Sequence, residues 1–293
     1  MDTITIAQVA ISGLALGGIY ALVGSGFHIT LRITNTVNFG QGDYLMLGCY
    51  ITLMFMRLNL PPYAILVLVI ISLAIAGIVL ERIAVRPVAT AGLSFVLTTM
   101  GIGMIVQNSA IITCGNFAQP FPSFFGGMRG MVISIGGIGF YIEEFFVILA
   151  SLIVMACFFV LIKKTIIGKA FAAVAYNPDS ASILGINVTR MKVLAYIIAS
   201  VLAGIAGFLI GPITSVEPFM GLKFAIKGFV AAVLGGLLNP VGIFIGALIL
   251  GLIENFTNLA TSQYGDMICF LIVIAVLYFR PSGLFTKQEA GSA

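Results

Sequence analysis

Charged side chains are scarce in this sequence. Only 8% of the 293 residues are Asp, Glu, Lys or Arg, whereas 60% are hydrophobic, and the mean hydropathy is +1.18. A soluble domain carries about 25% charged residues, which cover its surface. The scarcity therefore excludes a soluble enzyme and a disordered chain, and it predicts a polytopic membrane protein. The apolar stretches are continuous rather than alternating, which disfavours a β-barrel.

Side chains that perform catalysis or bind metals are also rare. The sequence has no Trp and a single histidine, His28, which cannot build a metal site or a catalytic triad alone. Cys49, Cys114, Cys157 and Cys269 show no paired spacing, so neither a disulfide framework nor a metal site is predicted. No G-x-x-x-x-G-K-[ST] loop for ATP is present. We therefore expect no catalytic residue, no metal and no cofactor, and we place His28 at a membrane interface.

Long segments without charge indicate where the chain crosses the membrane. A helix needs about 20 apolar residues to cross the hydrocarbon layer. Asn239-Pro240 interrupts the apolar segment 223–260, so this segment predicts two short or broken helices, about 223–238 and 241–260. Other crossings are predicted near 6–30, 62–81, 92–113, 144–162, 193–214 and 263–280, with a weaker candidate at 38–56. The predicted fold class is an all-α polytopic membrane protein with eight or nine transmembrane helices in a single domain, 1–293.

The distribution of Lys and Arg predicts the orientation, because these residues are enriched in cytoplasmic loops. One side would carry Arg32, Arg82, Arg86, Lys163, Lys164, Lys169, Arg190, Lys192, Arg280 and Lys287. The other side would carry Arg57, Arg129, Lys223 and Lys227. We therefore expect a cytoplasmic loop at 163–192, an outside loop at 114–144 and a cytoplasmic C-terminus. The N-terminus lies outside with nine crossings and inside with eight.

Three pairs of glycines are spaced four residues apart within predicted spans. They are Gly13 and Gly17, Gly207 and Gly211, and Gly242 and Gly246. Each pair shares one helix face and permits close approach of a neighbouring helix backbone. This pattern predicts ordinary helix packing and indicates no chemistry.

The cytoplasmic loop contains signals for two short helices. Asn177 suits the N-cap of a helix, Pro178 suits its first position, and Asp179 complements the helix dipole. Gly185 provides the stop, and 169–176 is also a fair helix. Such a helical elbow between two membrane spans suits docking into a groove of a partner. A merely solvated connector is the alternative interpretation.

Polar residues within the predicted spans are candidates for the transport path. Ionisable groups there are expensive to insert and often functional. Asp43 follows a glycine-containing segment with Asn38 and Gln41, and Gln107 and Asn108 lie in another span. Broken helices expose backbone groups at transporter binding sites. We expect these five residues to line a path, with a polar network that fixes helix packing as the alternative.

Two lysines and one glutamate lie nearer the predicted outer surface. Lys223 and Lys227 are four residues apart and share a helix face. They are expected to supply positive charge on the outer face, for a carboxylate or an acidic protein surface, or else to extend to the interface as lysines commonly do. Glu254 is expected to be interfacial.

Several stretches resemble one known family. The stretch GKAFAAVAYNPDSASILGINVTR, at 168–190, resembles the cytoplasmic coupling segment of the branched-chain amino acid permeases of LivH and LivM type. The stretches at 14–50, 81–88 and 97–108 look like the N-terminal blocks of the LivH side. The stretches at 228–254 and 277–285 match its C-terminal half. Gly40-Gln41 departs from the family, which often has Ala-His at this point.

The resemblance implies the permease fold of ABC importers and a transport subunit without enzymatic activity of its own. Implied partners are a second, LivM-like permease chain, two cytosolic ATPases that use ATP and Mg²⁺, and a periplasmic binding protein, in a bacterial inner membrane and without nucleic acid. The implied substrate is a branched-chain amino acid, with urea, amides or aromatic acids as alternatives. An ion-driven secondary transporter, for which Asp43 would be the acidic residue, is the second alternative. The implied ATPase-coupling residues are Gly168, Lys169, Ala173, Tyr176, Asn177, Pro178, Asp179, Leu184 and Gly185.

Overall fold

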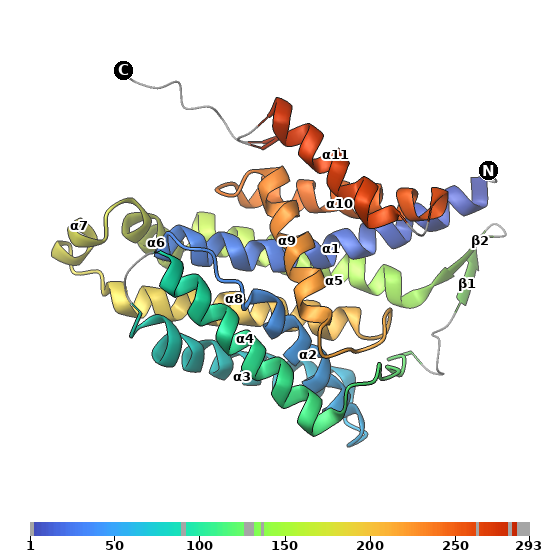
Figure 1. Ribbon diagram of the computed structural model, residues 1–293, viewed down its shortest axis with the longest axis horizontal. Helices are drawn as coiled ribbons and strands as arrows, with labels where there is room; N and C mark the ends of the chain where they lie inside the picture. Colours follow the sequence, from blue (N-terminus) through green and yellow to red (C-terminus); the bar gives the residue numbers. More distant parts are fainter. Residues whose placement is uncertain are drawn as a thin grey trace.

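The computed structural model describes residues 3–88, 92–125, 132–135, 138–261, 264–280 and 283–285. The described residues form eleven α-helices, one π-helical turn and one antiparallel β-hairpin (Figure 1). The first helices are α1 (Thr3–Thr34), α2 (Gln41–Met56), α3 (Pro62–Leu80), which continues into the π-helical turn Glu81–Val85, and α4 (Leu93–Cys114). The hairpin of β1 (Val132–Ile135) and β2 (Ile138–Tyr141) follows. The remaining helices are α5 (Ile142–Lys164), α6 (Ile166–Tyr176), α7 (Pro178–Ile183), α8 (Val188–Ile210), α9 (Met220–Gly235), α10 (Pro240–Ala260) and α11 (Gly265–Phe279).

This architecture confirms an all-α polytopic chain, and each predicted crossing coincides with a helix. Within the described residues, six helices are long and apolar enough to cross a membrane: α1, α3 with its π-helical turn, α4, α5, α8 and α10. Helices α2, α9 and α11 have 16, 16 and 15 residues, fewer than the roughly 20 needed for a full crossing. The predicted total of eight or nine crossings is reached only when these shorter helices are counted.

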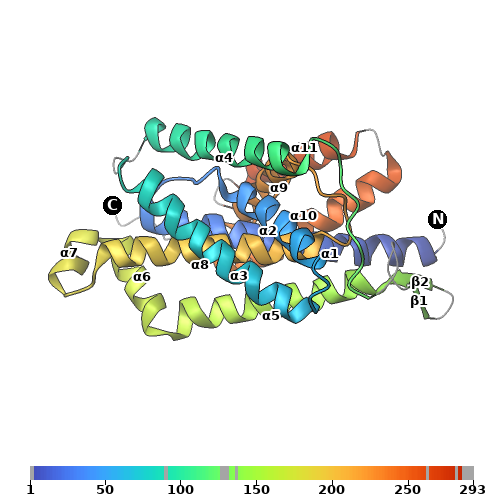
Figure 2. The same cartoon turned by 90° about the horizontal axis from the view of Figure 1, so that it is seen from below.

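The two ends of the helical bundle differ in content. Helices α6 and α7 protrude at one end, called here the elbow end, and the N-terminus and the β-hairpin lie at the other, called the hairpin end (Figures 1 and 2). Helices α1 and α5 finish at the elbow end and α8 starts there, which brings Arg32, Lys163 and Arg190 to this end. The predicted grouping of these charges on one side agrees with the structure. Arg129 and Lys287 lie outside the described residues.

Helix α1 lies in the interior of the bundle and contacts α5, α8, α9 and α10. Its close packing on α10 follows from its glycines. A Cβ at Gly17 would lie 2.8 Å from the Ala247 carbonyl oxygen, and one at Gly13 would lie 3.0 Å from that of Gly251. Small residues let helix backbones approach closely where no hydrophobic effect drives association. The packing role predicted for this glycine pair is confirmed.

The interruption predicted in segment 223–260 is also present. Gly236 has a φ of +94°, a conformation that glycine adopts without steric cost, and α9 ends before it. The side chain of Asn239 then caps α10 by accepting a hydrogen bond from the Val241 N–H at 3.2 Å. Pro240 occupies the first turn of α10, where its missing N–H costs nothing. Local sequence therefore divides this segment into two helices.

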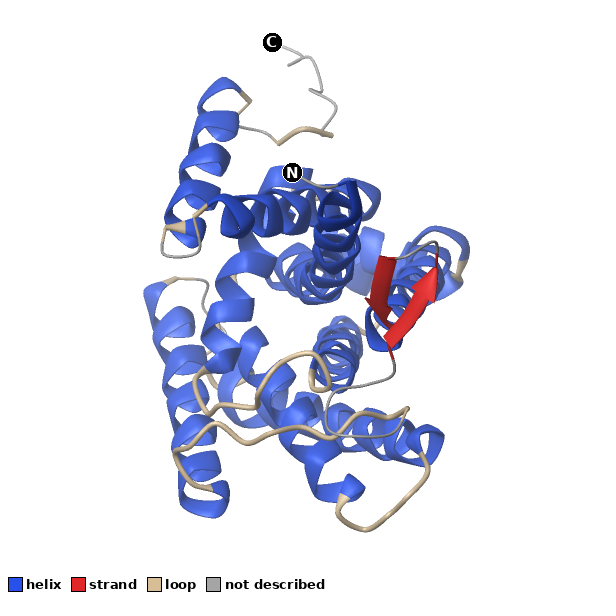
Figure 3. Cartoon of the chain, turned by 90° about the vertical axis from the view of Figure 1, so that its right-hand side faces the viewer, coloured by secondary structure: helices blue, strands red, loops and turns tan. Residues whose placement is uncertain are grey.

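Helices α2 and α9 cross near their N-terminal ends, where Gly42 packs against Gly221. Residues 35–40 connect the elbow-end terminus of α1 to the start of α2 without regular structure. In Figure 3, which shows the hairpin end, the two strands lie at the periphery of the helical bundle. Three of the five residues predicted for the path, Asn38, Gln41 and Asp43, therefore lie at or just before the start of the short helix α2.

Candidate functional site

The elbow end presents the two short helices predicted from the loop sequence. The Asn177 side chain accepts hydrogen bonds from the Asp179 and Ser180 N–H groups, both at 2.9 Å, and so caps α7. Gly185, with a φ of +84°, follows the end of α7. Thr165 caps α6 by accepting from the Gly168 N–H at 3.2 Å. The predicted cap and stop are confirmed, and α6 begins three residues earlier than the predicted start at Lys169.

The elbow has a buried side and an exposed side. Phe171 and Val174 of α6 are each 2% exposed and anchor the elbow to the bundle. On the other side Tyr176 is 93% and Leu184 is 79% exposed, although both are large and apolar. Exposed apolar side chains that gather into a patch are typical of a protein interaction site. The elbow therefore offers an apolar surface on a rigid support.

The residues predicted for coupling separate along these two sides. Those that are exposed are Lys169, Tyr176, Asn177, Pro178, Asp179, Leu184 and Gly185. Ala173 is half-buried. Gly168 is buried, and a Cβ there would meet the Ile162 carbonyl oxygen. Gly168 thus positions the elbow on the end of α5 and lies away from its exposed surface.

A second cluster of polar groups surrounds the start of α2. Asp43 is 8% exposed, and its Oδ1 accepts a hydrogen bond of 2.7 Å from the Gln107 side chain of α4. Gly103 of α4 leaves the space that the Asp43 carboxylate occupies. This arrangement connects α2 and α4 through a charge-assisted hydrogen bond, which is stronger than a bond between neutral groups.

Two amides lie deeper in the same cluster and are fully buried. Gln41 donates to the Ala199 carbonyl oxygen of α8 at 3.0 Å, and Asn38 accepts from the Gly40 N–H at 3.1 Å. The Oε1 of Gln41 and the Nδ2 of Asn38 have no partner among the described residues. Buried polar groups without partners are uncommon and require an explanation. The structure thus brings four of the five predicted path residues together.

Asn108 is the fifth predicted path residue, and the structure places it elsewhere. Its side chain is exposed and donates to the Met104 carbonyl oxygen of its own helix at 2.8 Å. One residue along a helix turns a side chain by about 100°, so Gln107 and Asn108 face different surroundings. Only Gln107 joins the cluster around Asp43.

Lys223 and Lys227 also have different environments. Lys223 is 68% exposed and lies 3.5 Å from the Glu217 carboxylate. Lys227 is 18% exposed and lies 2.7 Å from the carboxylate of Glu254 and 2.9 Å from that of Asp266. Lys223 fits the expected surface charge, whereas Lys227 is half-buried between one buried carboxylate, Glu254, and one exposed carboxylate, Asp266.

Comparison with known proteins identifies the family. The family described as "Branched-chain amino acid transport system / permease component" matches residues 9–277. This chain belongs to that family of permeases. It is 30% identical to the high-affinity branched-chain amino acid permease LivH of Salmonella typhimurium, with 96% of each chain covered. It is equally similar, at 30% identity and 96% coverage of each chain, to the permease BraD of Pseudomonas aeruginosa.

The chain is also similar to a permease with a different substrate in its name. A ribose import permease of Haemophilus influenzae is 26% identical over 92% of this chain and 83% of its own length. No solved structure matches the chain. As a member of this family, the chain is a membrane transport permease and not an enzyme.

Two residues of this permease are more deeply buried than expected from the sequence. Glu254 is 5% exposed rather than interfacial, and it accepts a hydrogen bond of 2.8 Å from Tyr20 besides the ion pair with Lys227. His28 is 1% exposed rather than interfacial, and its Nδ1 donates to the Leu237 carbonyl oxygen at 2.7 Å. Both lie on helix faces whose partners come from distant parts of the chain. The i, i+27 spacing of Lys227 and Glu254 gives no sequence signal for the pair.

Proposed function

We propose that this chain is one of two permease subunits of an ATP-driven importer for branched-chain amino acids. Two cytosolic ATPases drive the transporter and a periplasmic protein delivers the substrate to it. A LivM-like chain is the second permease, and the complex resides in a bacterial inner membrane with the C-terminus of this chain in the cytoplasm. ATP and Mg²⁺ are bound by the ATPases.

The observation that carries this proposal is the exposed elbow of α6 and α7. A transport subunit that holds no ATP needs a surface through which a motor protein moves it. The elbow joins α5 to α8 directly, so that a force on it reaches two long helices. Its exposed apolar residues, Tyr176 and Leu184, suit insertion into a groove of the ATPase. Asn177 and Gly185 keep the elbow in the shape that docking requires.

The elbow also agrees with the expected orientation. Lys163, Lys164 and Lys169 lie on or next to it, and all three are exposed. Basic residues are retained preferentially on the cytoplasmic side of a membrane. The elbow end would then face the cytosolic ATPases, and the hairpin end would face the delivering protein.

The cluster around Asp43 is the proposed contribution of this chain to the path. It lies at the N-terminal end of a short helix, as binding groups do in transporters with broken helices. Asp43 retains 8% exposure and Gln107 is half-buried, so an ion or a polar solute reaches these two before the fully buried Gln41 and Asn38. Gln41 and Asn38 would hold the start of α2 in place.

Recovery of the tagged chain from its native membrane in mild detergent tests the proposed assembly. Mass spectrometry is expected to identify a second permease chain and two ATPase chains. Uptake of labelled leucine by the reconstituted complex with the delivering protein is expected to require ATP and to withstand an uncoupler. Recovery of the chain alone, with uptake that collapses with the uncoupler, would establish an ion-driven transporter instead.

Three variants, one of them a matched control, test the docking surface. Tyr176→Ala removes a side chain that is 93% exposed, and Tyr278→Ala removes one that is 83% exposed on α11. Loss of an aromatic anchor at an interface costs about 2 kcal/mol or more, which corresponds to about a thirtyfold weaker association. We expect Tyr176→Ala and Asp179→Arg to reduce ATPase recovery and Tyr278→Ala to leave it unchanged. Equal recovery for all three variants would show that the ATPase docks elsewhere.

A further inference from the structure

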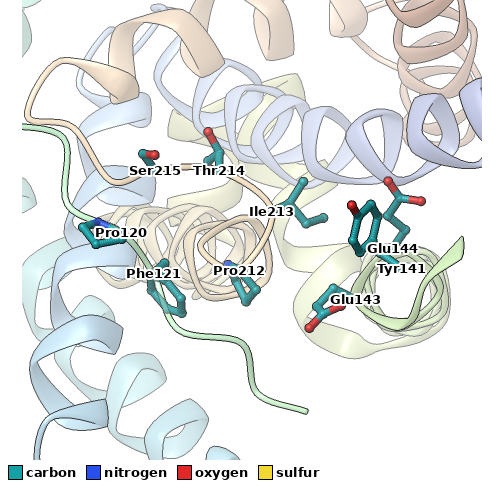
Figure 4. Close-up of a pocket in the computed structure, with 9 residues that line it drawn as sticks. All are labelled: Pro120, Phe121, Tyr141, Glu143, Glu144, Pro212, Ile213, Thr214 and Ser215. Atoms are coloured by element: carbon teal, nitrogen blue, oxygen red, sulfur yellow. The ribbon is translucent and has the colours of Figure 1, made fainter. Parts of the chain in front are cut away.

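A cavity of about 510 Å³ opens at the hairpin end, away from the elbow and from the cluster around Asp43 (Figure 4). Three segments form its walls: residues 120–121 before the hairpin, residues 141–144 at the start of α5, and residues 212–215 after α8. Binding sites for small molecules have volumes of about 300–1,000 Å³. The cavity is therefore large enough for an amino acid.

Glu143 carries the most unusual group of this cavity. Its side chain is 4% exposed, and its Oε1 accepts a hydrogen bond from the Ser123 hydroxyl. Its Oε2 has no hydrogen-bond partner among the described residues. Figure 4 shows the carboxylate on the side of α5 that faces Phe121 and Pro212. Leaving a buried carboxylate oxygen without a partner is costly, so this atom is expected to have one when the cavity is occupied.

Glu144, unlike Glu143, has a hydrogen-bond partner on another helix. Its Oε1 accepts a hydrogen bond of 2.6 Å from the Ser12 hydroxyl of α1, and Figure 4 shows it directed toward that helix. Acidic residues in a first helical turn stabilise the helix dipole, which explains two glutamates at the start of α5. Stabilisation of the helix dipole does not require that Glu143 be buried with one carboxylate oxygen lacking a hydrogen-bond partner.

The residues of the cavity favour a ligand with a positively charged group. Two carboxylates line it, and none of the nine lining residues that the structure describes is Lys or Arg. Such a concentration of one charge sign attracts the opposite charge. Pro120, Phe121 and Ile213 provide an apolar wall, and the hydroxyls of Thr214 and Ser215 lie across the cavity from Glu143.

We propose that this cavity is a receiving site for the free amino acid on the side where it is delivered. The primary ammonium group binds the Glu143 carboxylate, and the aliphatic side chain packs on Phe121 and Ile213. The choice of an amino acid as the ligand rests on the proposed function. The shared chemistry is a primary ammonium group, which a lysine side chain of the delivering protein also possesses.

Binding of four probes to the purified full chain, with its co-purifying partners in nanodiscs and without the delivering protein, tests the site. The probes are leucine, 3-methylbutylamine, 4-methylpentanoate and N-acetyl-lysine methylamide. Saturation-transfer NMR and calorimetry measure their binding. We expect leucine and the amine to bind and to compete, the amine more tightly because none of the described lining residues is a cation that could pair with a carboxylate. The carboxylic acid is expected not to bind.

Glu143→Gln is expected to weaken binding of both ligands about tenfold or more, since it removes a charge-assisted hydrogen bond. Ile213→Ala keeps both glutamates and is expected to weaken binding about threefold through the lost apolar contact. Glu217→Gln is the matched control: Glu217 does not line the cavity and its side chain is 43% exposed, so binding stays unchanged. Thermal unfolding of each variant shows whether it is folded.

Three results overturn the proposal: binding that Glu143→Gln and Ile213→Ala both leave unchanged, binding of the carboxylic acid as tight as that of leucine, or binding of the lysine derivative without binding of leucine. A second measurement distinguishes failure of the receiving site from failure of the proposed function. It is ATP-dependent leucine uptake by the reconstituted transporter with the delivering protein. Uptake without leucine binding at the cavity rejects the receiving site alone. Binding at the cavity without ATP-dependent uptake rejects the importer.

Discussion

Gly42 and Gly221 meet backbone to backbone where α2 crosses α9. A Cβ at Gly221 would lie 2.6 Å from the Gly42 carbonyl oxygen, and a Cβ at Gly42 would overlap the Gly221 carbonyl oxygen. Each glycine therefore leaves the space that the backbone of the other helix fills. The crossing brings the first turns of two short helices together, beside the cluster that contains Asp43.

Alanine at this crossing is expected to separate the two helices. Because backbone and not a flexible side chain fills the space, Gly42→Ala should destabilise the protein by about 1–3 kcal/mol and reduce transport. Gly101→Ala on α4 is the matched control, because a Cβ there has nothing within 4 Å. Thermal unfolding in detergent and leucine uptake measure both effects. A Gly42→Ala protein as stable as Gly101→Ala would show that α2 and α9 cross less closely.

Removal of Lys227 is expected to destabilise the protein more than removal of its exposed partner, Asp266. Lys227→Met leaves Glu254, with 6% of its side chain exposed, without its cation, and breaking a buried pair costs about 3–5 kcal/mol. The Asp266 side chain is 66% exposed, so Asp266→Asn should cost less than about 1 kcal/mol.

The double variant Lys227→Met with Glu254→Gln isolates the pair. It should lose less stability than the two single variants together, because it leaves no buried charge without a partner. Thermal unfolding of the four proteins provides the comparison. Additive losses would mean that Lys227 and Glu254 act independently.

Gln107 and Asn108 are expected to respond differently to the same substitution. Gln107→Leu removes the 2.7 Å hydrogen bond to Asp43 and should cost about 1–3 kcal/mol, because the carboxylate stays buried without its donor. Asn108→Leu removes a bond to its own helix on an exposed face and should change neither stability nor uptake. Equal uptake by both variants would show that Asp43 does not contribute to the transport path.

The cap of α7 is expected to support coupling. Asn177→Ala removes the acceptor for two N–H groups and should cost about 1 kcal/mol of local stability. Asn177→Asp keeps a capping oxygen and should behave like the unchanged protein. Hydrogen exchange of 178–184 measures the local effect, and ATP hydrolysis stimulated by the delivering protein measures coupling. Faster exchange in Asn177→Ala with unchanged stimulation would make the cap structural only.

Features that depend on a few neighbouring residues were predictable from the sequence. The elbow is one example, because Asn177 and Pro178 act at the first turn of α7 and Gly185 acts directly after its end. The break at Asn239 and Pro240 is another. The spacing of charges located the long helices, because a charge is costly in hydrocarbon whatever the tertiary structure.

Features that depend on distant residues were not predictable in the same way. Glu254 was expected at an interface, but Tyr20 and Lys227 surround it from two other helices. Gln107 and Asn108 were equivalent candidates for the path, and only the packing of α4 on α2 distinguishes them. The cavity at Glu143 is formed by three separate segments, none of which has a motif of its own.

By itself, the sequence determined that this protein is a helical membrane permease, roughly where its helices lie, and that an elbow joins two of them. These properties follow from hydropathy, charge and capping, which are local. The tertiary structure alone decided which polar groups are paired, which are buried without a partner, and where a cavity remains. Those properties depend on distances between residues far apart in the chain, and a single sequence carries no record of such distances.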